Sequence, residues 1–190
     1  METSPKNKIK SYLIGVAIGD GNLSNPNGRA VRLRVSCDKK YPKLVDEIER
    51  NIKILLPKNK VSRINRTGCV DISCYSNSLE AILGWKAKDG SKAKQSARIP
   101  LWIRRNKTYT KECLRGLFQT DGSIYYDRGY KMLNFTTIIP ELEKDVRESI
   151  LKFGFKSYSR RVVFKGKFAY IIRISKNVDE FIETIGLWKE

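Results

Sequence analysis

The chain of 190 residues contains no histidine. This absence excludes Ser-His-Asp and Cys-His catalysis, histidine-ligated zinc and a histidine general base. Any chemistry must therefore use carboxylates, lysines, hydroxyl groups or a bound metal ion. Long apolar runs are also missing, and a membrane-spanning helix needs about 20 consecutive apolar residues. We therefore expect no membrane partner.

Acidic residues are scarce relative to basic ones. The chain has 20 Asp and Glu against 38 Lys and Arg, which gives a net charge of +18. Residues 1–97 carry 19 basic and 9 acidic side chains, and residues 98–190 carry 19 and 11, so both halves are positive. A field of this sign attracts polyanions and indicates nucleic acid as the partner. A basic protein without such a partner is the alternative.

The four cysteines follow no metal-binding spacing and are interpreted as buried reduced thiols. They are Cys37, Cys69, Cys74 and Cys113. Reduced thiols are typical of a reducing compartment, which predicts an intracellular protein of the cytoplasm or of a DNA-containing organelle.

The chain is predicted to contain two copies of one α-β-β-α-β-β-α plan. The first copy has a helix at 8–20, a hairpin ending in strand 29–37, a helix at 41–55, strands at 60–66 and 69–75, and a short helix at 77–84. The second has a helix at 109–121, a hairpin ending in strand 131–137, a helix at 140–153, strands at 157–165 and 168–175, and a helix at 177–187. Pro42 and Pro140 open the middle helices, a position that favours proline. We expect halves at 1–85 and 99–190, a polar linker at 86–98, and a short helix over IPLWIRRN (99–106) with Trp102 buried.

Two short stretches at matching places, YLIGVAIGDG (12–21) and LRGLFQTDG (114–122), each end a helix on an acid. A carboxylate at a helix C-terminus is disfavoured by about 0.3–1 kcal/mol, because that end of the dipole is negative. A nearby cation would remove the penalty. The alternative is that each Asp-Gly only caps a helix and opens a hairpin.

Small residues four positions apart share one helix face in both stretches: Gly15 with Gly19, and Gly116 with Thr120. Small residues let two helix backbones approach closely. If the two helices pack on each other, Asp20 and Asp121 lie side by side. Their oxygens would form a negative pocket suited to Mg²⁺.

LIGVAIGDG and LRGLFQTDG resemble the two motifs of single-chain LAGLIDADG homing endonucleases, and the repeat resembles the fold of that family over essentially the whole chain. The resemblance implies an α+β protein of tandem pseudo-two-fold repeats, each with a four-stranded antiparallel DNA-binding sheet, packed through the two motif helices. It implies a monomer that cuts both strands of double-stranded DNA at a long site. The first hairpin is longer than the second, so we expect that site to be imperfectly palindromic.

The resemblance also implies the site residues. Asp20 and Asp121, aided by the carbonyls of Gly19 and Thr120, would hold Mg²⁺, with Mn²⁺ or Ca²⁺ as substitutes and Ca²⁺ without cleavage. Matching the copies through their prolines adds Asp38, Lys39 and Thr136, although Asp38 departs from the usual glutamine. A lysine after the last helix of each repeat is assigned to Lys94, with Lys86, Lys88 and Lys92 as alternatives, and to Lys189.

The strands carry candidate DNA-reading side chains. In strand 29–37 the apolar residues face one way, and Arg32, Arg34 and Ser36 face the other. A two-stranded ribbon fits the major groove, where arginine binds guanine and asparagine binds adenine. The remaining candidates are Arg63, Arg66, Tyr125, Tyr130, Asn134, Arg161, Lys165, Arg173 and Ser175.

Three hypotheses compete. The first is the endonuclease. The second keeps the fold and changes the activity, as an RNA maturase bound to intron RNA or as a DNA-binding protein that does not cut. The third is a structural or RNA-binding protein without catalysis, for which substitution of either aspartate changes stability slightly and nothing else.

Overall fold

Two four-stranded antiparallel sheets with the same strand order form the outer parts of the molecule. The computed structural model describes residues 4–164 and 166–189. The first sheet has the order β1 (Gly21–Ser24), β2 (Arg32–Asp38), β4 (Cys69–Tyr75) and β3 (Val61–Asn65). The second has the order β5 (Gly122–Asp127), β6 (Tyr130–Thr137), β8 (Lys167–Ile174) and β7 (Tyr158–Phe164). The repeated order gives the two halves one topology.

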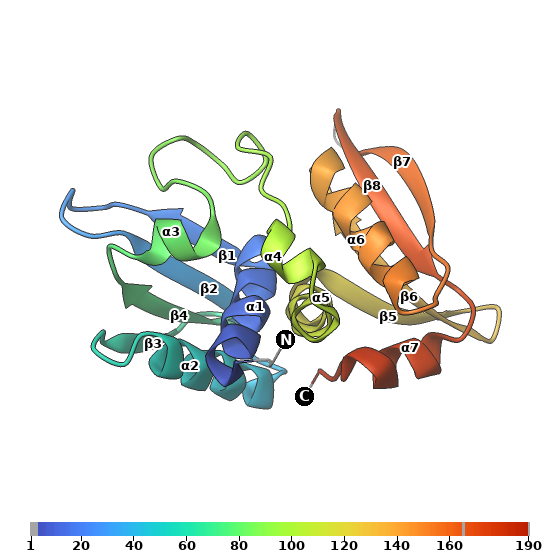
Figure 1. Ribbon diagram of the computed structural model, residues 1–190, viewed down its shortest axis with the longest axis horizontal. Coiled ribbons are helices and arrows are strands. Elements are labelled where there is room, and N and C mark those ends of the chain that lie inside the picture. The colour runs from blue at the N-terminus through green and yellow to red at the C-terminus, as the bar shows by residue number, and fades with distance from the viewer. Residues whose placement is uncertain (1–3, 165, 190) are drawn as a thin grey trace.

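The helices lie between and beside these sheets (Figure 1). They are α1 (Pro5–Gly19), α2 (Pro42–Leu55), α3 (Leu79–Leu83), α4 (Leu101–Arg104), α5 (Lys107–Asp121), α6 (Pro140–Lys152) and α7 (Val178–Ile185). The motif helices α1 and α5 pack together at the centre, with one sheet on each side. This arrangement puts the two motif ends at the middle of the molecule.

The core follows from the alternation of apolar residues. In β2, Leu33, Val35 and Cys37 are buried, while the residues between them are half-buried on the opposite face. In the second half, Phe118 of α5 packs against Phe135 of β6, with ring centroids 5.6 Å apart. Because α1 and α5 contribute to the same buried cluster, one core spans both halves.

The predicted fold class is confirmed, and helix and strand boundaries agree within a few residues. Proline occupies the first turn of α1, α2 and α6, where its missing N–H has no helical partner to lose. Three cysteines are buried, Cys69 is half-buried, and all four are free. Among the described residues, no helix has the length and apolar character to cross a membrane.

Trp102 departs from the prediction, because its exposed fraction is 36% and the side chain is not buried. The rings of Trp102 and Tyr109 pack in a T-shaped arrangement with their centroids 5.5 Å apart, and the Lys10 ammonium lies 5.3 Å from the Trp102 ring centroid. The apolar neighbour of Trp102 in the short helix, Ile103, is the residue that enters the core.

Candidate active site and nucleic-acid interface

The motif helices approach so closely that glycine is required where they touch. A Cβ on Gly116 would lie 2.8 Å from the backbone nitrogen of Val16 and closer still to the carbonyl oxygen of Tyr12. A Cβ on Gly15 would meet the backbone of Cys113. Real Cβ atoms do not approach backbone this closely, so α1 and α5 pack through these two positions. The same packing brings the helix ends together.

Asp20 and Asp121 lie at these adjoining ends. Asp20 is the C-cap of α1, and Asp121 is the last residue of α5. The Oδ2 atom of Asp121 would lie 3.3 Å from a Cβ placed on Gly19, which puts the second carboxylate at the end of the first motif helix. The side-by-side arrangement expected from the glycine spacing is therefore present in the structure.

Both carboxylates hold their protons more tightly than usual. Both aspartates are partly open to solvent, while the rest of each side chain is crowded by protein atoms. Burial, followed by the negative charge of Asp20, raises the pKa of Asp121 to about 6. Burial also raises the pKa of Asp20, against the lowering effect of Lys92 and Lys189. Two acids that resist ionisation together are a suitable place for a cation.

Two lysines bind the carbonyl groups at these helix ends. The Lys92 ammonium donates to the carbonyl oxygens of Ala17 at 3.2 Å and Ile18 at 2.6 Å, and also to that of Gly19. The Lys189 ammonium donates to the carbonyl oxygens of Thr120 and Gly122. A cation at a helix C-terminus satisfies unpaired carbonyls and complements the helix dipole.

The lysine contacts link the two halves. Lys92 binds the end of α1. Burial lowers the pKa of Lys92, and the largest effect in the opposite direction is the negative charge of Asp121 in α5. Lys189 binds the end of α5, and the negative charges of Asp20 and Asp121 both oppose the lowering of its pKa by burial. The Asp121 site thus combines the acid of one half with a lysine bound to the motif helix of the other, and Lys189 acts on both carboxylates.

The Asp121 pocket opens into a cavity of about 320 Å³. Its lining includes Gly19, Lys92, Asp121 and Thr136, so the predicted residue Thr136 does reach the site. The hydroxyl of Thr137, in contrast, accepts from the backbone N–H of Ile139 and is used within the fold.

The first-half counterparts lie beside the Asp20 pocket. Asp38 is exposed and accepts from the backbone N–H of Lys40 at 3.0 Å. This bond, aided by the Lys40 ammonium and more weakly by the Lys189 charge, lowers the pKa of Asp38. Lys39 is exposed and fixed only through its backbone N–H, which donates to the carbonyl of Gly68 at 3.1 Å. Asp38 is therefore near Lys189, and the structure shows no side-chain contact that draws Lys39 to the site.

The structure brings Lys92 to the carboxylates and leaves Lys94 outside. Lys94 is exposed, and its side chain packs beside Gly90 in the linker. The assignment of Lys94 among the linker lysines therefore disagrees with the geometry, and Lys92 replaces it. A loop has no periodicity that could tell four nearby lysines apart, so the sequence held no signal for this choice.

Sequence reasoning also missed Gln119, a buried residue of α5. Its Nε2 atom donates to the carbonyl oxygen of Trp188 at 3.1 Å, which fixes the backbone just before Lys189. The same amide group lies 3.4 Å from Glu47 Oε2, and Glu47 in turn pairs with Arg115 at 2.6 Å. This network joins α5 to α2 across the two halves.

The oxygen donors at the motif ends fit a hard divalent cation. They are two carboxylates and the carbonyl groups of Gly19 and Thr120, the ligand type that Mg²⁺ and Ca²⁺ prefer. The two carbonyl oxygens accept from Lys92 and Lys189 in this structure, so a cation bound to them would displace these ammonium groups. Within residues 4–164 and 166–189, no cluster of three or more His, Cys, Asp or Glu side chains could hold a metal alone. A cation here would need further ligands from water or a bound phosphate.

The first sheet turns a polar face away from its helices. Strand pairing puts Arg32, Arg34 and Ser36 on this face, together with the buried Asp71. The Ser36 hydroxyl donates to Asp71 Oδ1 at 2.6 Å. Arg66 pairs with the same carboxylate from beyond the end of β3 and so belongs to this face.

Arg63 lies on the other face and is removed from the reading set. It pairs with Ile72, which points into the core, and its guanidinium binds Asp46 and Glu49 of α2. Residues on this side cannot contact a duplex that lies on the polar face. Asn22 and Ser24 of β1 pair with Arg34 and Arg32, so they lie on the polar face and are candidates that the prediction missed.

The polar face of the second sheet carries more aromatic side chains. Asn134 pairs with Arg173, and its Nδ2 atom donates to the Tyr125 hydroxyl at 3.1 Å. Tyr130 is 70% exposed on the same face, and Ser175 is exposed just past the end of β8. The predicted residues of β5, β6 and β8 therefore form one surface.

Arg161 does not belong to that surface, because it pairs with Tyr170 on the face that includes Phe168. Its guanidinium lies 3.5 Å from the Phe168 ring centroid. Arg160 is the arginine of β7 that shares the reading face, and the prediction missed it by one position. Lys165 lies outside the described residues.

Comparison with known protein families shows two matches, one in each half of the chain. A family described as the LAGLIDADG-like domain matches residues 108–186, and one described as the WhiA LAGLIDADG-like domain matches residues 9–72. The chain belongs to the LAGLIDADG family. It is a two-motif member, because each match contains one motif helix and its carboxylate.

Solved LAGLIDADG structures share this fold. A structure of the homing endonuclease I-DmoI is 18% identical, with a TM-score of 0.72 over 96% of this chain and 91% of that chain. Another, of I-DmoI with DNA and Mn, has a TM-score of 0.71 over 95% and 97%. The N-terminal LAGLIDADG domain of DUF199/WhiA is 16% identical, with a TM-score of 0.68 over 99% and 87%.

Two curated relatives are much longer than this LAGLIDADG chain. A DNA polymerase of Thermococcus hydrothermalis is 31% identical over 150 residues, which cover 75% of this chain and 8% of the polymerase. A tRNA-splicing ligase RtcB of Pyrococcus furiosus is 24% identical over 208 residues, covering 96% of this chain and 21% of the ligase. The chain thus matches only a small part of each.

Proposed function

We propose that this LAGLIDADG protein is a metal-dependent endonuclease that cuts both strands of double-stranded DNA as a single chain, at a long and imperfectly palindromic site. The observation that carries the proposal is the meeting of the two motif-helix ends, which brings two acids and two lysines together between two sheets with basic faces. A pair of equivalent centres suits a ligand with two antiparallel strands.

Divalent metal would be held by Asp20 and Asp121 with the carbonyls of Gly19 and Thr120, and Mg²⁺, Mn²⁺ or Ca²⁺ suits these oxygens. When bound, the cation lowers the pKa of a water molecule and stabilises charge on the phosphate and leaving oxygen. The two carboxylates supply the negative charge that attracts it. Their tendency to keep a proton makes the metal and the proton competitors for the same oxygens.

The two lysines have a separate part in the proposal. Lys92 and Lys189 place positive charge beside the carboxylates, where a DNA phosphate must lie to be cut. An ammonium group held in a partly water-excluded pocket stabilises charge that develops on phosphate oxygens. Because the lysines bind protein carbonyls, they are already positioned before DNA arrives.

The reading faces would set the target. Arg32, Arg34 and Arg66 of the first half favour guanine contacts, and Asn134 of the second half favours adenine. Because the two faces differ in residue type, the half-sites should differ in sequence. We also propose an intron- or intein-type homing role, supported by the match to short parts of otherwise different proteins.

A DNA-binding protein that does not cut is the second candidate. It is favoured by the match of residues 9–72 to the WhiA LAGLIDADG-like domain. Both aspartates and both lysines are present at the motif ends of this chain, which supports the endonuclease over the inert binder.

Incubation of the protein with a randomised duplex library, with Mg²⁺ or with EDTA, tests the choice. The endonuclease predicts double-strand breaks at one long motif, lost with EDTA and in Asp20→Asn, with DNA binding retained. Lys94→Ala is the matched control and should cut normally. Tight and selective binding without cleavage would refute the endonuclease and favour the inert binder.

A further inference from the structure

The segment 86–98 between the two halves is a closed loop and not a loose tether. Oε1 of Gln95 accepts from the backbone N–H of Lys86 at 2.7 Å. Nε2 of Gln95 donates to the carbonyl oxygens of Lys86 at 2.8 Å and Gly90 at 3.0 Å. One side chain thus closes the loop with three hydrogen bonds to its backbone.

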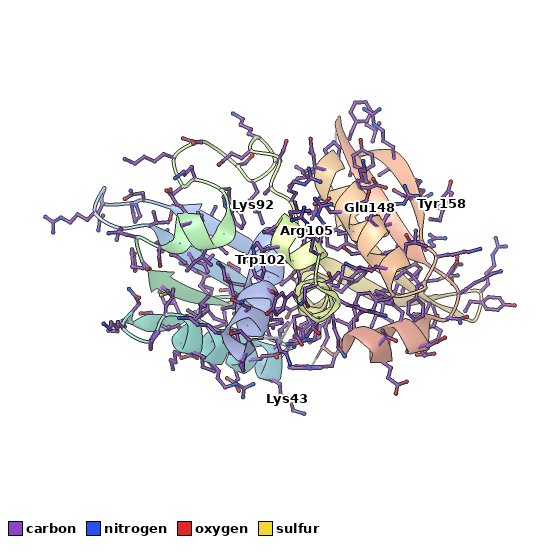
Figure 2. All side chains as sticks on the ribbon, in the orientation of Figure 1. Lys43, Lys92, Trp102, Arg105, Glu148 and Tyr158 are labelled. Atoms are coloured by element: carbon purple, nitrogen blue, oxygen red, sulfur yellow. The ribbon has the colours of Figure 1, made fainter. Side chains whose placement is uncertain are left out.

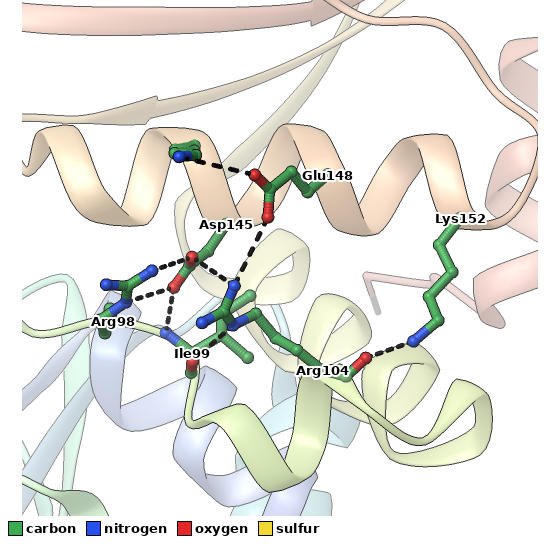
Figure 3. Close-up of polar contacts among 7 residues, drawn as sticks. Arg98, Ile99, Arg104, Asp145, Glu148 and Lys152 are labelled. Carbon is green, nitrogen blue, oxygen red and sulfur yellow. Dashed lines mark hydrogen bonds and ion pairs between the residues drawn. The ribbon is translucent and has the colours of Figure 1, made fainter.

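Both ends of this loop are fixed to different halves. At its start, the backbone N–H of Ala87 donates to Oε1 of Glu80 in α3 at 2.8 Å. At its end, the fully buried Asp145 of α6 accepts two bonds from Arg98, at 3.0 and 2.6 Å, and one from the N–H of Ile99 at 3.1 Å (Figure 3). The loop therefore has a defined path over the motif helices.

Lys92 lies between these anchors, and Figure 2 shows it between the loop and the motif helices. The turn that contains Lys92 is held by two backbone hydrogen bonds. The Lys92 carbonyl accepts from the N–H of Ala97 at 3.0 Å, and the N–H of Gln95 donates to the carbonyl of Ser91 at 3.2 Å. A lysine side chain has many rotamers and loses conformational entropy when it is fixed in one of them. A fixed loop backbone therefore helps to keep the Lys92 ammonium in one position.

We propose that Gln95 is a positioning residue, which holds the loop so that the Lys92 ammonium lies in the Asp121 pocket. This inference rests on the proposed function. Gln95 itself touches only the loop backbone, so its effect on cleavage passes through Lys92. Since Lys92 lines a cavity with Asp121, and Asp20 and Lys189 are not part of its lining, the loss of Gln95 acts mainly on the DNA strand cut beside Asp121.

The experiment measures single-turnover cleavage of each strand of the selected target by Gln95→Met, Lys92→Met and the double variant. Methionine keeps the length of Gln95 and removes its hydrogen bonds. We expect Gln95→Met to slow one strand about 10- to 100-fold, as other orienting residues do, so that nicked DNA accumulates. Lys92→Met should slow the same strand, and the double variant should be no slower than Lys92→Met. Lys94→Ala in the same loop is the control and should cut both strands at the wild-type rate.

Equal slowing of both strands, unchanged rates, or additive effects in the double variant would each overturn the positioning role. Limited trypsin digestion supplies a measurement that does not need cleavage activity. Chain scission after Lys92 should be faster in Gln95→Met than in wild type, and an unchanged rate would overturn the inference. A wild-type protein that cuts no duplex refutes the proposed function. In that case the digestion still tests whether Gln95 holds the loop around Lys92.

Discussion

The contact between the motif helices gives a sharp test, because one methyl group at Gly116 changes both stability and geometry. A Cβ at this position would lie 2.8 Å from the nitrogen of Val16, and comfortable contacts between heavy atoms are about 3.5–4 Å. The helices must therefore separate by on the order of 1 Å to admit Gly116→Ala. Both partners are backbone atoms in helices, so no side-chain rotation relieves the contact.

The expected change in the free energy of unfolding of Gly116→Ala follows from two opposing effects. Overpacking a close contact costs about 1–3 kcal/mol, and replacing glycine by alanine inside a helix returns up to about 1 kcal/mol. We expect a net loss of about 1–2 kcal/mol, which for a chain of this size lowers Tm by about 2–8 °C. Displacement of a reacting group by 1 Å costs about 100-fold in rate, so cleavage should fall far more than stability.

Thermal unfolding and single-turnover cleavage are measured together. Gly15→Ala enters the same contact from the other helix and should act alike. The double variant should lose less stability than the two single variants together, because the first methyl group already separates the helices. Gly154→Ala is the control, since this residue has a φ of 88° and open space around it, so the variant should lose stability and keep its cleavage rate. A higher Tm for Gly116→Ala would refute the close approach of α1 and α5.

Three further outcomes follow from the site. Because the pKa of Asp121 is raised to about 6, protons compete with metal below that pH, and calorimetry should show Mn²⁺ affinity falling from pH 7 to pH 5. The same raised pKa means that the metal-free fold loses stability as the pH rises through about 6, so Asp121→Asn should unfold at a higher temperature than wild type at pH 7, with the difference gone at pH 4. Arg34→Ala should relax base choice in one half-site only, by about 1–3 kcal/mol per guanine contact, and site selection that changes in both half-sites would contradict the division of the reading faces.

The motif helices could be predicted because the decisive signal is local. Glycines four residues apart define one helix face whatever surrounds them, and Gly15 and Gly116 do meet the opposite backbone. The acids that follow each helix were therefore placed correctly beside each other. The alternation in β2 was equally local, since residues two apart in a strand share a face.

The errors lie where position depends on partners far along the chain. Arg63 and Arg161 have the right residue type, but strand register puts both on the helix side of their sheets. Only pairing with β4 and β8 fixes that register, and a shift of one residue exchanges the faces. Lys92 could not be distinguished from Lys94 because the loop path is set by Gln95 and by Asp145, which lies in the other half of the chain.

The site shared between the two halves has a consequence for protein engineering. Since Asp20 and Lys189 come from different halves, and Lys92 binds the end of α1 while it lines a cavity with Asp121, a half produced alone lacks part of the site. If the chain cuts DNA as proposed, two separately expressed halves would cut only after they meet through the Gly15–Gly116 face. Halves from different proteins could be combined to address new targets, provided that this face and the loop that carries Lys92 are transferred together.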